Sequence, residues 1–199
     1  ACLVGSEMCI RDRYSVVKGT GVVAGTQEDM NKGITDSASK DVTVVMPKNS
    51  KVTLDNGIAN EGANSRNITF VGDGTATVDV ITNAINAEGG ELNYQRGSTF
   101  TFENLTIQGG EGNFDGIVCD ELVYKNCTIK GKLTLYGKAT FINCVFENDM
   151  ANQYSIWTWG GTDVTFEGCT FNTNGKAILL YGQATDCLLY TSDAADDKA

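Results

Sequence analysis

The side chains that could carry out chemistry in this chain are mainly carboxylates, arginines and cysteines, because the 199-residue sequence has no histidine. Mechanisms that need an imidazole base or a histidine metal ligand are therefore excluded. Cleavage of a glycosidic bond would need two carboxyl groups at a defined separation. The carboxylates that could form such a pair are Asp115, Asp120, Glu121, Glu147, Asp149, Asp163 and Glu167. Asp120 and Glu121 are adjacent, and adjacent residues of a strand face opposite sides. We interpret all seven as ordinary acidic surface and predict no catalytic residue among them.

Arginines and loop carboxylates give the remaining candidates for chemistry. Arg66 and Arg96 both precede expected strands, and we interpret each as a solvated loop residue rather than a catalytic base. Calcium could be held by carboxylates together with backbone oxygens. The loop candidates are Asp73, Asp79 and Asp115, but no DxDxDG loop supports them. We therefore predict no metal site and no cofactor.

Both ends of the chain read as translated DNA-sequencing adapter. One codon choice for residues 7–13 and one for residues 186–192 contain stretches that are reverse complements of each other. We therefore interpret residues 1–13 and 187–199 as adapter-derived tails, to be set apart from fold reasoning. The alternative is a signal-like N-terminus and an acidic tail, but three charged residues interrupt the apolar run that a signal peptide needs. Between the tails we expect a cap region, 14–40, and a repeat region, 41–186.

The net charge of the chain limits the classes of partner that it can bind. The formal net charge is −10. Nucleic-acid backbones are bound by lysine and arginine, so we expect no nucleic-acid partner. An acidic surface also disfavours anionic membranes, and no stretch approaches the length of a membrane-spanning helix.

The chain repeats itself. Four segments align without gaps, TFTFENLTIQG from residue 99, ELVYKNCTIKG from 121, KATFINCVFEN from 138 and TDVTFEGCTFN from 162. A partial copy, NITFVGDG, starts at residue 67. Alternating apolar and polar residues predict short strands with one buried face. A single strand cannot bury that face alone, so successive copies must stack on a shared core.

Two positions of the repeat carry specific expectations. The step between strands is predicted to be a left-handed corner, occupied by Asn104, Asn126, Asn143 and Gly168. The residue after it is cysteine in three copies, and these side chains should form an inward stack, Cys127, Cys144 and Cys169. We interpret the stack as reduced thiols acting as small buried apolar groups. A disulfide or a metal cluster is the alternative, although no CxxC pair indicates zinc.

A second set of strands carries an aromatic row. The segments KLTLYG from residue 132, SIWTWG from 155 and AILLYG from 177 each end in an aromatic residue and glycine. Aligning the glycines places four rings on one outward face, Tyr136, Trp157, Trp159 and Tyr181. Flat exposed rings suit stacking on sugars, so these four residues are the candidate ligand-binding site. The alternative is that a loop such as 147–154, or another subunit, covers the rings.

The N-terminal part is predicted to cap the repeats. Residues 26–40 place Met30, Ile34 and Ala38 four apart, which is typical of an amphipathic helix. Thr26 is the expected N-cap, whereas Gly33 weakens the helix prediction. Strands are expected at 41–47 and 51–55. A helix over the open end of the repeats would protect strand edges.

These features give the chain a family resemblance. The helix followed by VTVVMP, with the repeated TFENLTI, VYKNCTI, TFINCVF and VTFEGCTF, resembles the pectate-lyase-like superfamily over roughly residues 26–183. It is especially similar to surface or phage-encoded repeat proteins of gut microbes. The resemblance implies an all-β fold, a right-handed parallel β-helix solenoid with a short N-terminal capping helix. It implies less about activity, because lyases, hydrolases, adhesins and phage tail spikes share this fold.

We therefore expect a non-catalytic module of a secreted, cell-surface or virion-associated protein that contacts glycans or a host surface. One alternative is a fragment of a polysaccharide lyase or glycoside hydrolase. A lyase of this superfamily would use an Arg or Lys base with acidic calcium ligands, and neither Arg66 nor Arg96 has repeat-aligned acidic partners. The other alternative is a structural solenoid spacer. A glycan and a second copy of the chain are the expected partners.

Overall fold

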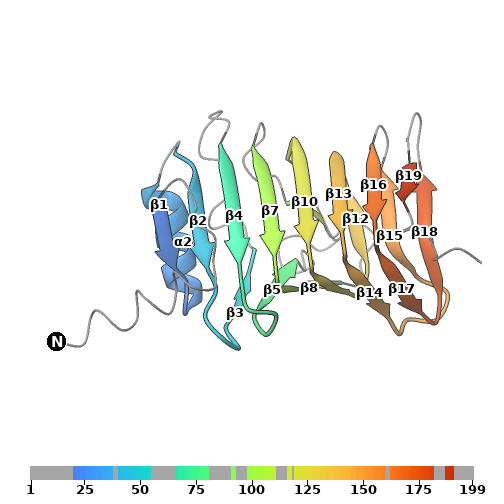
Figure 1. Ribbon diagram of the computed structural model, residues 1–199, viewed down its shortest axis with the longest axis horizontal. Coiled ribbons are helices and arrows are strands. Elements are labelled where there is room, and N and C mark those ends of the chain that lie inside the picture. The colour runs from blue at the N-terminus through green and yellow to red at the C-terminus, as the bar shows by residue number, and fades with distance from the viewer. Residues whose placement is uncertain are drawn as a thin grey trace, which may run out of the picture.

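The computed structural model describes residues 20–37, 40–54, 66–80, 91–92, 98–110, 116–117, 119–159, 162–181 and 187–190. Within these residues the chain forms parallel β-strands and one α-helix (Figure 1). This agrees with the all-β class that the alternating sequence pattern predicts. No helix among the described residues has both the length and the hydropathy to cross a membrane.

The largest sheet runs the whole length of the molecule in Figure 1. Its 8 strands are parallel and follow chain order. They are β1 (Thr20–Val23), β2 (Val42–Val45), β4 (Asn67–Val71), β7 (Thr99–Glu103), β10 (Glu121–Lys125), β13 (Lys138–Ile142), β16 (Val164–Glu167) and β19 (Cys187–Tyr190).

The smaller sheets are parallel as well. A 6-stranded sheet contains β3 (Lys51–Thr53), β5 (Thr77–Val80), β8 (Thr106–Gly109), β11 (Thr128–Lys130), β14 (Val145–Asn148) and β17 (Thr170–Thr173). A 3-stranded sheet contains β12 (Leu133–Leu135), β15 (Tyr154–Trp159) and β18 (Lys176–Tyr181). A pair of short strands is formed by β6 (Glu91–Leu92) and β9 (Gly116–Ile117).

The chain visits the sheets in turn. From β10 onward each strand of the first sheet is followed by one of the second and one of the third, and the cycle then repeats. Registers agree with the sequence alignment, since Tyr124 pairs with Phe102 on one side and with Phe141 on the other. Phe141 pairs in turn with Phe166. The four aligned segments therefore occupy equivalent places in the structure.

The corners between the first and second sheets are left-handed, as predicted. Asn104, Asn126 and Asn143 have φ of 54°, 51° and 52°, and Gly168 has φ of 60°. Asparagine tolerates this region better than most residues because its short amide can bond locally. A Cβ atom on Gly168 would lie 2.6 Å from Oδ1 of Asn143. Glycine at the last corner therefore leaves room for the asparagine side chain of the preceding repeat.

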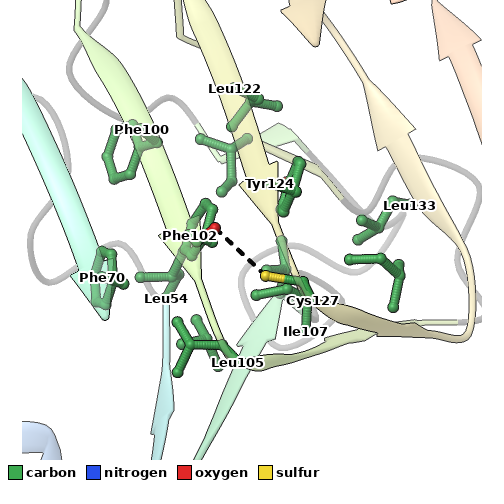
Figure 2. Close-up of a cluster of buried hydrophobic side chains, with 14 of the residues drawn as sticks. Leu54, Phe70, Phe100, Phe102, Leu105, Ile107, Leu122, Tyr124, Cys127 and Leu133 are labelled. Carbon is green, nitrogen blue, oxygen red and sulfur yellow. Dashed lines mark hydrogen bonds between the residues drawn. The ribbon is translucent and has the colours of Figure 1, made fainter. Parts of the chain in front are cut away.

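The core consists of side chains stacked from repeat to repeat. One aromatic column runs Phe70, Phe102, Tyr124, Phe141 and Phe166, with successive centroids 5.3, 5.1, 4.7 and 5.1 Å apart. Figure 2 shows Phe70, Phe102 and Tyr124 of this column among neighbouring leucine and isoleucine side chains. These rings are all buried, and each adds stacking to the burial of its apolar area.

Helix α2 (Gln27–Asp36) closes the N-terminal end of the sheets (Figure 1). Thr26 caps it through a reciprocal bond pair with Asp29, and Met30 and Ile34 are buried beneath it. Gln27 bonds both backbone groups of Thr53 at the free edge of the second sheet, with both distances 2.7 Å. The predicted helix and its N-cap are therefore confirmed for the described residues; Ala38 lies outside them.

Two segments set apart by the sequence analysis take part in the sheets. Strand β1 lies within the 14–40 cap region and pairs with β2. Strand β19 lies within the 187–199 tail and pairs with β16, where Phe166 is opposite Leu189. Both are short apolar runs, TGVV and CLLY, and such a run can extend a free parallel edge whatever its origin. The repeat boundaries at 41 and 186 are therefore not boundaries of the first sheet.

Candidate functional site

The predicted aromatic row lies on the third sheet in the expected register. Leu133 pairs with Ile156, which pairs with Ile178, so the glycine-based alignment of these strands is confirmed. Trp159 pairs directly with Tyr181. Ile156 is buried, so alternation turns Trp157 to the opposite, outward face. Tyr136 follows Leu135 and takes the position opposite Trp159.

The rings of this row differ in how much of each is open. Tyr181 is 49% exposed. Trp157 and Tyr136 are half-buried. The backbone of Trp159 is part of β15, but its side chain lies outside the described residues. Trp157 and Tyr181 meet edge to face, with centroids 5.8 Å apart.

Part of the outward face is covered. Lys132 and Thr134 take outward positions on or next to β12, yet both are buried. The Nζ atom of Lys132 lies 5.2 Å from the centroid of the Trp157 ring, a cation–π contact in a desolvated setting. Trp157 Nε1 and Ser155 Oγ are buried with no hydrogen-bond partner in the described part of the chain. The row is therefore partly covered around Trp157, in line with the alternative of a covered face, and it is open at Tyr181.

The carboxylate candidates do not assemble. Glu121 pairs with Lys138 at 2.9 Å and Glu147 with Lys130 at 3.6 Å, both across neighbouring strands on the surface. Asp79 is largely buried and pairs with Lys51 at 2.8 Å. No three acidic or cysteine side chains in the described ranges are grouped so that they could hold a metal ion. Asp115 and Arg96 lie outside the described residues.

Arg66 corrects a prediction, because it is buried and not a solvated loop residue. Its guanidinium donates to the carbonyl of Ile34 at 3.1 Å and to that of Lys40 at 3.4 Å. Burial lowers its pKa, which the charge of Asp41 partly offsets. The carbonyls at the end of α2 need donors, and a cation is favoured at that end of a helix. Arg66 therefore ties the cap to the sheet, and this role follows from the placement of α2, which the residues next to Arg66 do not encode.

The cysteine stack is present and its thiols are free. Cys127 and Cys144 are buried and Cys169 is half-buried. A hydrogen bond with Cys127 raises the pKa of Cys144 to about 12, and a bond with Cys144 raises that of Cys169. The bond from Cys144 lowers the pKa of Cys127. Each thiol also lies within hydrogen-bond reach of a backbone carbonyl of the preceding repeat, that of Phe102, Tyr124 or Phe141. This arrangement is suited to packing rather than nucleophilic attack.

No protein-family model matches the chain, and no curated protein or solved structure matches it either.

Proposed function

We propose that this chain is a right-handed parallel β-helix related to the pectate-lyase-like superfamily, serving as a non-catalytic module of a secreted, cell-surface or phage tail protein. The regular cycle of strands through three sheets supports the solenoid, as do the equivalent registers of the aligned repeats. Crossovers between parallel strands are overwhelmingly right-handed. The helix over one end fits the capping repeat that solenoids need.

The partner of this module is a glycan, held by the outward row of the third sheet. The observation that carries this proposal is the edge-to-face pair of Trp157 and half-open Tyr181 on neighbouring strands. Trp157 pairs in register with Leu179, so Tyr181 is its diagonal neighbour, and the two rings meet at 75°. The open face of the Tyr181 ring, supported by the edge contact with Trp157, is the platform on which a sugar ring stacks. The preceding ring, Tyr136, is half-buried and extends the platform along the sheet.

A structural spacer is the second candidate, and the covered part of the same face favours it. Lys132 and Thr134 are buried at outward positions, and the indole Nε1 of Trp157 is sealed from solvent. A face packed in this way stabilises the solenoid without a ligand. Tyr181 is exposed in either case. The two candidates therefore differ in whether its ring contacts a glycan.

Binding and product analysis on one panel of soluble polysaccharides tests the proposal. Depletion of the protein onto each glycan is measured, and the supernatants are examined by mass spectrometry for shortened or unsaturated products. We expect binding without products. Tyr181→Ala and Trp157→Ala should each weaken it about tenfold, or about 1.4 kcal/mol.

The matched control is Tyr154→Ala, which removes a half-buried tyrosine from the same strand as Trp157 but leaves the row intact. Equal losses in Tyr154→Ala and Tyr181→Ala would contradict the platform. Products would replace the proposal with a polysaccharide-degrading enzyme. Absence of binding to every glycan would leave the spacer.

A further inference from the structure

Three asparagines of the repeat region are followed two residues later by threonine. They are Asn67, Asn104 and Asn126, and the residue between asparagine and threonine is not proline in any of them. This is the pattern that an oligosaccharyltransferase recognises when it attaches an N-linked glycan. An attached glycan is bulky and solubilising, so the folded chain must leave it at the surface. The structure therefore distinguishes between the three candidate acceptors.

Asn126 is the best presented of the three acceptors. It forms the left-handed corner between β10 and β11 with φ of 51°, and it is exposed. Its side-chain amide makes no hydrogen bond to the described part of the chain. Asn104 is only partly exposed, and the N–H of Gly74 donates to its carbonyl at 2.7 Å, so a neighbouring segment runs beside that corner. Asn67 is exposed, but its Nδ2 donates to Oδ2 of Asp41 at 3.2 Å.

The next corner along the sheets has the same shape but lacks the hydroxyl group. Asn143 is exposed, has φ of 52° and is followed by a cysteine, as Asn126 is. Two residues further on, Val145 takes the place of Thr128, and these two residues pair in register. Thr170 follows Val145 in the same column, so this position accepts either threonine or valine. The two corners therefore form a natural matched pair that differs in the residue an oligosaccharyltransferase needs.

We propose that Asn126 is a site of N-linked glycosylation when the chain passes through a secretory pathway that supplies a lipid-linked oligosaccharide. In the transfer, Nδ2 of Asn126 forms a bond to the anomeric carbon of the first sugar, and the bond from that carbon to the lipid pyrophosphate breaks. The pyrophosphate leaves with its lipid, and the amide gives up one proton. The glycan lies at the corner between the first and second sheets, away from the row on the third. This inference shares with the proposed function only the secreted location.

Secretion of the full chain from a eukaryotic host, behind a cleavable leader, tests this proposal. Intact-mass analysis and peptide mapping, before and after treatment with peptide N-glycosidase, locate each glycan. We expect a glycan at Asn126 in most chains and none at Asn143. Thr128→Val should remove the glycan from Asn126, and Val145→Thr should add one at Asn143, because each variant changes only the residue two positions after the corner.

The matched control combines Thr128→Val with Val145→Thr, which keeps both asparagines and the composition of the chain. We expect this double variant to carry its glycan at Asn143 instead of Asn126, and circular dichroism checks that it keeps the β-structure. Chains retained in the host are analysed in the same way as secreted ones. An unmodified Asn126, or a glycan that persists there in Thr128→Val, would overturn the proposal. Polysaccharide binding by the chain made without glycans tests the proposed function separately.

Discussion

The two ends of the sheets differ in how far the core is covered. At the N-terminal end, Gln27 bonds the backbone groups of Thr53, and Arg66 bonds the carbonyl of Ile34 in the last turn of α2. Met30 and Ile34 are buried under the helix. At the C-terminal end, Phe171, Leu180 and Tyr181 keep one face uncovered. The edge strand of a parallel sheet leaves backbone groups unpaired. A separate element such as α2 is therefore needed to cover that edge.

The strongest test of this difference removes the same ring from the interior and from the open end. Phe146→Ala should lower the free energy of unfolding by about 3–5 kcal/mol, because the ring is enclosed on all sides. Phe171→Ala removes an equivalent, half-buried ring and should cost less than about half of that. Urea unfolding measures both. Equal losses would mean that the open end is as well packed as the interior.

A test of the capped end uses the contact between α2 and β1. A Cβ atom on Gly33 would overlap the side chain of Val22, so Gly33→Ala should push the helix away and cost about 1–3 kcal/mol. Alanine is otherwise the better helix former by about 1 kcal/mol. The control is Gly21→Ala, since a Cβ there meets nothing within 4 Å. A stabilised Gly33→Ala variant would show that α2 does not pack tightly on the sheet.

A smaller effect comes from the interior thiols through pH. The folded-state pKa of Cys144, about 12, lies above its ordinary value of 9.0. The folded chain therefore keeps a proton that the unfolded chain loses, and stability that is full below pH 9 falls as the pH rises toward 12. The slope is about 1.4 kcal/mol per pH unit for this thiol. Cys144→Ala should show a shallower decline in urea unfolding between about pH 9 and about pH 11; an unchanged decline would contradict the raised pKa of this thiol.

The periodic features of the fold were predictable from sequence because the same residue pattern recurs in every aligned segment. Aligning four segments gave the register of Tyr124 and Phe141 and the left-handed corners at Asn126 and Asn143. A corner needs a residue that tolerates positive φ, and an inward position needs an apolar one. Both demands recur in every copy and therefore stand out.

Features outside the repeat could not be read in this way. The role of Arg66 depends on where the end of α2 lies, and nothing next to it in the sequence encodes that. Gly33 weakened the helix prediction, whereas the structure places it where β1 approaches too closely for a side chain. Burial of Lys132 and Thr134 likewise depends on what covers an outward face, which alternation along a strand does not specify.

Hydrogen exchange of the full chain tests the central comparison most directly. Amides of β2 and β3, beneath α2, should exchange at the slow rate of the interior strands β10 and β13. Amides of β17 and β18 should exchange much faster, because local opening there breaks pairing on one side only. Equal protection at the two ends would contradict the account of one closed and one open end.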